Sequence, residues 1–259
     1  MIRVLGRVRV EGFGRMMTSQ QQAMVAMLGL HGPCGRDHLI DAVWGGRAIS
    51  DSRFANLLAE IRAAIGRHRL VQNPDGRYEL LDVAVDVERF TDLVEPALAS
   101  SVPALDDPGV QDALDRLELA IGLIDGPILE SGRRRFWGWL DDGYHRRYEI
   151  EQQVVSAGLR AAVLALGAHQ PQRARWACER CLVAVPHDER LVTTLAEIHL
   201  VQGRQGAAAD LVAGWEQAVR RLGLGEPPSG PRDRLVVGRG ATVSEQAAVG
   251  QQGAKLRGI

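Results

Sequence analysis

The chain has 259 residues, of which 46% are hydrophobic and 24% charged, and its formal net charge is −1 at pH 7. This globular composition excludes a largely disordered chain and a collagen-like repeat, and three cysteines are too few for a disulfide scaffold. A net charge close to zero argues against a protein that coats nucleic acid without sequence preference, but it is compatible with a local basic surface. At about 100 to 200 residues per domain, the length predicts one large domain or two ordinary ones.

The sequence lacks the features of a membrane or exported protein. No run approaches the roughly 18 to 20 apolar residues that a membrane helix needs. The first ten residues, MIRVLGRVRV, alternate charged and apolar side chains, unlike a secretory signal peptide. We therefore expect a soluble, cytoplasmic protein that does not bind membranes.

The first third of the chain begins with a strand-like pattern and continues with helical ones. Apolar residues alternate with charged ones over residues 2–11, which predicts one half-buried strand. Thr18 and Ser19 each precede a glutamine by three residues, a capping-box pattern that predicts the start of a helix, and Gly32 ends it. A second helix is predicted over residues 36–44 from the helical spacing of its apolar residues.

The third predicted helix, residues 51–66, carries the clearest amphipathic pattern. With Asp51 as its N-cap, it places Phe54, Leu58, Ile61 and Ile65 at spacings of four, three and four, a stripe that must face a core. Two short strands follow, joined by the turn sequence Asn-Pro-Asp-Gly, and predict a β-hairpin. A strand, three helices and a closing hairpin form a winged helix-turn-helix, whose third helix is the candidate reader of a DNA major groove.

The rest of the chain is predicted to be almost entirely helical. Residues 95–108 are rich in small, acidic and proline residues and are expected to link a winged helix-turn-helix domain, 1–94, to a helical domain, 109–226. The Leu164 and Gly167 pattern recurs 36 residues later, an offset close to that of the helix-pair repeats that stack into tetratricopeptide-like solenoids. Residues 227–259 contain few large apolar side chains and are expected to form a weakly ordered tail. The predicted class is mostly α with a small β component.

Several segments together resemble a known bacterial architecture over residues 1 to about 225. In the first half they are LGRVRVEG, RDHLIDAVWGG, AEIRAAIG, GRYEL and VDVERF, and in the second LELAIGLIDGP, ARWACERCLVAVPHDERL and RRLGLGEPPSG. In order and spacing they resemble the Streptomyces antibiotic regulatory protein family of actinobacteria, in which an OmpR-like winged helix precedes a bacterial transcriptional activator domain. The resemblance implies a helix-turn-helix on DNA, a hairpin wing near the backbone, and a tetratricopeptide-like domain for dimer or polymerase contacts.

Candidate DNA contacts lie on the predicted outward face of residues 51–66 and near the wing. Asn56 suits the N6 and N7 atoms of adenine, whereas arginines suit guanine or phosphate. Glu60 and Ala63 depart from the resembled family, whose helix commonly carries arginines at these places. Residues 44–81 hold six arginines and four acidic residues, a mildly positive field. The candidate contacts are Arg47, Ser52, Arg53, Asn56, Arg62, Arg67 and Arg77.

Other chemistry finds little support in the sequence. Cys178 and Cys181 form a CxxC pair without a second pair, so we interpret them as buried residues of a helix face rather than zinc ligands. His199 is expected to be a hydrogen-bonded core residue, and Arg133–Arg135 a solvated run before aromatics that pack. No phosphate-binding loop or catalytic constellation is present, so we expect no enzyme, cofactor or metal.

Two functions follow from these patterns. The first is a transcriptional regulator, an activator, that binds double-stranded DNA as a homodimer and contacts RNA polymerase or another protein through its helical domain. The alternative is a protein-interaction module whose degenerate winged helix no longer binds DNA and whose tetratricopeptide-like surface holds a partner. Glu60 and Ala63 favour the second function, and the arginines favour the first.

Overall fold

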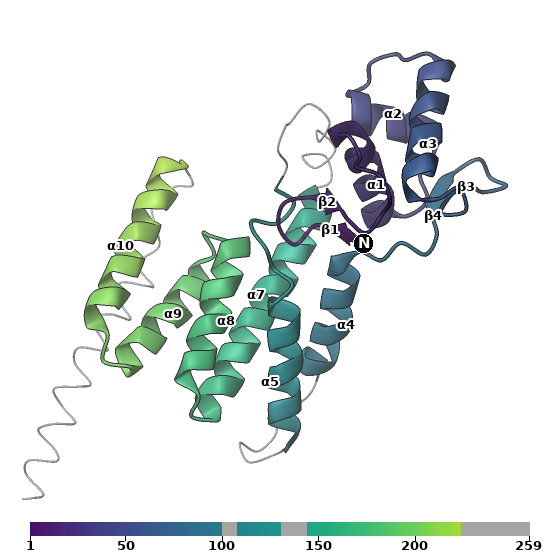
Figure 1. Ribbon diagram of the computed structural model, residues 1–259. Coiled ribbons are helices and arrows are strands. Elements are labelled where there is room, and N and C mark those ends of the chain that lie inside the picture. The colour runs from purple at the N-terminus through teal and green to yellow at the C-terminus, as the bar shows by residue number, and fades with distance from the viewer. Residues whose placement is uncertain (100–107, 131–143, 224–259) are drawn as a thin grey trace, which may run out of the picture.

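The computed structural model describes residues 1–99, 108–130 and 144–223, and the chain in these ranges is mostly helical (Figure 1). The elements are β1 (Ile2–Arg3), β2 (Arg9–Val10), α1 (Ser19–His31), α2 (Arg36–Trp44), α3 (Asp51–Ile65), β3 (Leu70–Gln72), β4 (Tyr78–Leu80), α4 (Asp86–Ala99), α5 (Pro108–Ile121), α7 (Tyr144–Gly167), α8 (Pro171–Ala184), α9 (Glu189–Val201) and α10 (Gln205–Arg221). A winged-helix-like region thus precedes a helical region, which confirms the predicted fold class.

The helix starts show how local sequence fixes the first region. Thr18 caps α1, and its side chain and that of Gln21 form the predicted capping box. The cap of α3 was predicted wrongly, because Ser50 is the N-cap and its hydroxyl accepts from the Arg53 amide at 3.3 Å. Asp51 is instead the first helical residue, and its carboxylate pairs with the guanidinium of Arg36.

The N-terminal segment is a hairpin rather than the single strand that its alternation predicts. β1 pairs antiparallel with β2, with Ile2 opposite Val10 and Arg3 opposite Arg9. Asp86 of α4 holds the turn between them, because its carboxylate accepts a hydrogen bond from the backbone amide of Val4 at 2.9 Å. Because apolar residues on both strands face the core, the alternation carries through the turn and conceals it.

The core of the winged-helix region forms beneath α3 as expected. Phe54, Leu58, Ile61 and Ile65 are all buried, which confirms the predicted stripe. Tyr78 of β4 meets the Phe54 ring edge-on, with ring centroids 5.6 Å apart. The β3–β4 pairing places Leu70 opposite Leu80 and Gln72 opposite Tyr78, so the wing is the predicted hairpin.

The winged-helix region is joined to the helical region by backbone hydrogen bonds as well as by packing. The Leu5 carbonyl accepts from the Asp125 amide at 2.7 Å, and the Val8 amide donates to the Glu130 carbonyl at 2.9 Å. Gly6 lies so close to this loop that a Cβ there would be 2.8 Å from the Gly126 nitrogen. α3 and the β3–β4 hairpin lie at the edge remote from α7–α10 (Figure 1).

The helical region stacks α5 and α7–α10 side by side (Figure 1). Cys178 and Cys181 are buried on α8, as predicted, and no Cβ fits at Gly158 of α7, because it would lie 2.7 Å from the Cys181 sulfur. α4 continues to Ala99, so the expected boundary at residue 94 falls inside a helix. Most of the expected linker, 95–108, the run 133–135 and the expected tail, 227–259, lie outside the described residues.

Two further observations concern the helical part of the chain. His199 of α9 is buried as expected, but its Nδ1 has no hydrogen-bond partner among the described residues, so the prediction of a hydrogen-bonded core histidine is wrong for that atom. Within the described ranges, no helix is both long enough and apolar enough to cross a membrane.

Candidate nucleic-acid interface

The face of α3 that points away from the core is exposed along its whole length. Its buried stripe leaves polar and small residues on the opposite side, and none of them is covered by another described part of the chain. The loop between α2 and α3 adds the exposed Arg47, and the wing turn adds Arg77. The exposed residues of the helix are Asp51, Ser52, Arg53, Ala55, Asn56, Ala59, Glu60 and Ala63, and Arg67 and His68 follow its C-terminal end.

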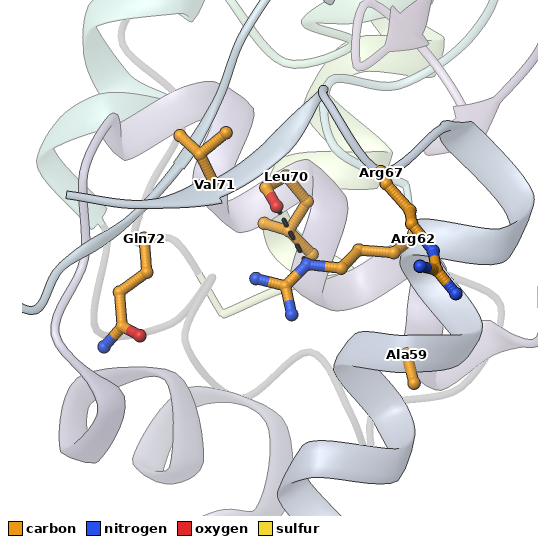
Figure 2. A pocket seen from close by; sticks show the side chains of 6 residues that line it. All are labelled: Ala59, Arg62, Arg67, Leu70, Val71 and Gln72. Atoms are coloured by element: carbon orange, nitrogen blue, oxygen red, sulfur yellow. Dashed lines mark hydrogen bonds between the residues drawn. The ribbon is translucent and has the colours of Figure 1, made fainter.

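Arg62 behaves differently from the other predicted contacts because it is half-buried and bonded to the wing. Its Nε donates to the carbonyl oxygen of Leu70 at 2.9 Å, which ties α3 to β3. Figure 2 shows its guanidinium within a groove of about 570 Å³ between this helix and strand. The lining residues are Ala59, Arg62, Arg67, Leu70, Val71 and Gln72. The terminal nitrogens of Arg62 therefore keep their donors for an anion that enters the groove.

A second hollow lies on the other side of α3, where it meets the start of α1 and the end of α2. Its volume is about 300 Å³, and its lining residues are Gln20, Trp44, Ser52, Arg53, Asn56, Leu57 and Glu60. Trp44 Nε1 and Gln20 Nε2 are buried donors without a hydrogen-bond partner among the described residues. Unsatisfied buried donors are costly, and both of these nitrogens are closed off from solvent, so they stay without an acceptor beneath the wall of the hollow.

Sequence reasoning missed both donors in this hollow. Trp44 fits the apolar stripe of α2 and was assigned to the core, where its side chain is indeed 8% exposed. Trp44 lines the hollow only because α3 packs against the end of α2, where Trp44 lies beside Phe54. No spacing within one helix reports such a crossing, and the available signal was chemical: a buried tryptophan N–H needs an acceptor.

Glu60 lies at the rim of the same hollow and is held by Gln21 of α1. Gln21 is buried, and its Nε2 donates to a Glu60 carboxylate oxygen at 2.7 Å. No arginine, lysine or histidine lies within ion-pairing distance of the Glu60 carboxylate among the described residues. The carboxylate is therefore positioned but not neutralised.

The cations of this surface are mostly available to an external anion. The guanidinium groups of Arg47, Arg53 and Arg67 form no ion pair or hydrogen bond with the described part of the chain. Arg77, whose side chain is 60% exposed, lies 3.5 Å from the Asp75 carboxylate, and such an exposed pair is weak. The structure thus places the predicted contacts on α3, in the segments that precede and follow it, and, for Arg77, at the turn of the β3–β4 hairpin.

The CxxC pair lies far from this surface and has the properties of core thiols. Burial raises the pKa of the Cys178 thiol to about 12, and it also raises the pKa of Cys181. A protonated thiol is neither a nucleophile nor a metal ligand at neutral pH. Within the described residues, no group of three or more His, Cys, Asp or Glu side chains could hold a metal ion.

Comparison with protein-family models gives no match, and comparison with curated proteins also gives none. Among solved structures, the chain is similar to Mycobacterium tuberculosis EmbR, determined in complex with a low-affinity phosphopeptide. The TM-score is 0.61 with 19% sequence identity, and the match covers 95% of this chain and 70% of the EmbR chain. At this identity the likeness concerns the fold: the protein shares with EmbR the arrangement of a winged-helix-like region followed by a helical region.

Proposed function

We propose that the protein is a transcriptional regulator that binds double-stranded DNA in a sequence-specific manner, with α3 in the major groove and the β3–β4 hairpin along the backbone. The observation that carries this proposal is the exposed face of α3, which presents Asn56 between unpaired arginines at the edge of the molecule farthest from α7–α10. A helix with one apolar face buried and a polar face open is what the major groove admits.

The contacts divide into base-reading and backbone-binding groups. Asn56 and Arg53 lie near the start of α3, where groove-reading helices approach base edges, and suit adenine and guanine respectively. Arg62 and Arg67 flank the groove beside β3 and suit a backbone phosphate, and Arg77 adds a wing contact.

The helical region would then serve assembly and activation. We propose that the chain acts in the cytoplasm as a homodimer on DNA, and that the surface of α5 and α7–α10 contacts RNA polymerase or another protein. The similarity of fold to EmbR and the resemblance to the antibiotic regulatory family support this assignment of DNA binding to the winged-helix region and of protein contacts to the helical region. No step in this function requires an enzyme activity or a cofactor.

The alternative, a protein-interaction module that does not bind DNA, is favoured by one observation. The outward ridge of α8 exposes Trp176 and Val183, whose side chains are 39% and 42% accessible, at a helical spacing of seven residues. Exposed aromatic residues are enriched at protein interfaces. This surface is compatible with either function, so a measurement of DNA binding is needed to distinguish the regulator from the interaction module.

Fluorescence anisotropy with the full chain and a duplex from the region upstream of its own gene tests the proposal. Binding should weaken steeply with salt, with a slope of about −0.9 per neutralised phosphate in a plot of log K against log salt. Asn56→Ala should reduce discrimination between this duplex and a scrambled one more than it reduces total binding. The control Arg89→Ala removes an exposed arginine of α4 and should change neither quantity. Absence of binding to any duplex at low salt, with a stoichiometric protein partner recovered instead, would support the alternative.

A further inference from the structure

Glu60 presents an apparent contradiction in a DNA-binding face, because a carboxylate is repelled by phosphates. Its side chain is nevertheless held in a defined place. The backbone amide of Thr18, the N-cap of α1, donates to Gln21 Oε1 at 2.8 Å. Because an amide N–H can only donate, this bond requires the oxygen end of the Gln21 side chain to face the N-cap. Gln21 Nε2 must then face outward, where it donates to Glu60 Oε2 at 2.7 Å.

This chain of hydrogen bonds orients the carboxylate without neutralising it. Gln21 supplies a neutral donor to one oxygen, and no described cation lies within ion-pairing distance. Glu60 Oε1 therefore keeps its acceptor capacity at the rim of the hollow that also contains Ser52, Arg53 and Asn56. Asn56 lies one helical turn before Glu60, so both side chains project from the same strip of α3.

The chemistry of base edges limits what such a carboxylate can accept from. In the major groove, guanine presents two acceptors and thymine one acceptor beside a methyl group, and each acceptor would repel the carboxylate. Adenine offers an amino group, but its N7 acceptor lies beside it. Cytosine presents an N4 amino donor without an adjacent acceptor on its own edge.

We infer that Glu60, positioned by Gln21, is a specificity-determining residue that selects cytosine at one place in the DNA site by accepting a hydrogen bond from N4. The inference rests on the proposed DNA-binding function and goes beyond it by naming the base. It also explains why an acidic residue is compatible with this surface: the carboxylate lowers the affinity for sites with the wrong base as well as binding the right one.

The test is selection of binding sites from a random duplex pool by the full chain and by three variants. Wild type should enrich a site with one invariant cytosine. Glu60→Gln should shift that position toward adenine and Glu60→Arg toward guanine, while the other positions stay unchanged. Glu95→Gln removes one exposed carboxylate of α4, away from α3, and should enrich the wild-type site.

A second measurement leaves the protein unchanged. Deoxyuridine in place of the invariant cytosine substitutes an O4 acceptor for the N4 donor and should weaken Kd by about 5- to 150-fold, the range expected for one good base contact.

The outcomes separate this inference from the proposed function. If wild type enriches a site and the Glu60 variants enrich the same one, the cytosine assignment is wrong and DNA binding stands. If only Glu60→Arg binds DNA, Glu60 repels DNA and the assignment is again wrong. If neither wild type nor any of the variants enriches a site, the proposed function itself fails.

Discussion

Arg62 Nε and the carbonyl oxygen of Leu70 are 2.9 Å apart, and this hydrogen bond fixes the wing against the helix that we propose reads DNA. Arg62→Lys retains the charge but cannot reproduce a bond from Nε together with two free terminal nitrogens. We expect the free energy of unfolding to fall by about 0.5 to 1.5 kcal/mol. DNA affinity should also fall, whereas its salt dependence should change little because the charge is kept. Urea denaturation and anisotropy measure the two effects.

Arg67→Ala is the matched comparison for Arg62→Lys. Arg67 is exposed and unpaired in the described part of the chain, so its removal should leave stability nearly unchanged. It should lower the magnitude of the salt slope by about 0.9, the contribution of one phosphate contact. If both variants changed the slope equally, the distinct role of the Arg62 bond would be wrong.

Gly6 tests the connection between the winged-helix and helical regions. An alanine Cβ there would lie 2.8 Å from the backbone nitrogen of Gly126, and backbone atoms cannot move aside cheaply. Gly6→Ala should therefore lower the free energy of unfolding by about 1 to 3 kcal/mol, as overpacking does. Gly14→Ala is the control, because a Cβ at Gly14 meets nothing within 4 Å. Equal effects of the two substitutions in urea denaturation would contradict the close approach.

Asp86 gives a pH dependence of unusual sign. Burial raises the pKa of its carboxyl above the ordinary aspartate value of 3.8, although the backbone amides of Val4 and Leu5 donate to the carboxylate and favour ionisation. The folded state therefore binds this proton more tightly than the unfolded state. The resulting stabilisation is fully present below pH 3.8 and is lost as the pH rises through the raised pKa of the folded state.

Asp86→Asn removes this titration and so isolates it. The difference in unfolding free energy, wild type minus variant, should shrink as the pH rises from below 3.8 toward neutrality. Denaturation at a series of pH values measures that difference, and groups that titrate in both proteins cancel. A difference that grows with pH would show that the amide donors outweigh burial.

Two glycines of the helical region should respond in opposite directions. A Cβ at Gly158 of α7 would lie 2.7 Å from the Cys181 sulfur and 3.0 Å from Leu191, so Gly158→Ala should destabilise the protein by about 1 to 3 kcal/mol. Gly214 lies within α10 with nothing near its Cβ position, and Gly214→Ala should stabilise by about 0.5 to 1 kcal/mol. Thermal denaturation of both variants checks the pair, and a shift in the same direction would contradict it.

The features that sequence predicted well depend on neighbours in the chain. The Thr18 capping box, the Phe54 stripe and the wing turn each involve residues within one or two helical turns, where spacing determines geometry. Local ambiguity explains the error at α3, because Ser50 and Asp51 are both good capping residues and only the backbone at Ser50 is extended.

The features that sequence could not predict join separate elements. The Gln21–Glu60 bond spans 39 residues, and the bonds between the N-terminal turn and residues 125–130 span far more. Period-two alternation also fails to distinguish one strand from a tight hairpin with both arms on the core. The helix wheel identified the exposed face of α3, but the anchoring of Arg62 and the unpartnered nitrogen of Trp44 depend on how α3 crosses its neighbours.

Protection of a cysteine introduced on α3 tests the central claim most directly. The native cysteines, Cys34, Cys178 and Cys181, are buried, so a maleimide should react chiefly with an added thiol. Ala63→Cys places that thiol on the exposed face of α3, and Ala213→Cys places a control on the exposed side of α10. We predict that a saturating concentration of the selected duplex slows the reaction of Ala63→Cys and leaves that of Ala213→Cys unchanged. An equal rate for Ala63→Cys with and without DNA would contradict the placement of α3 in the major groove.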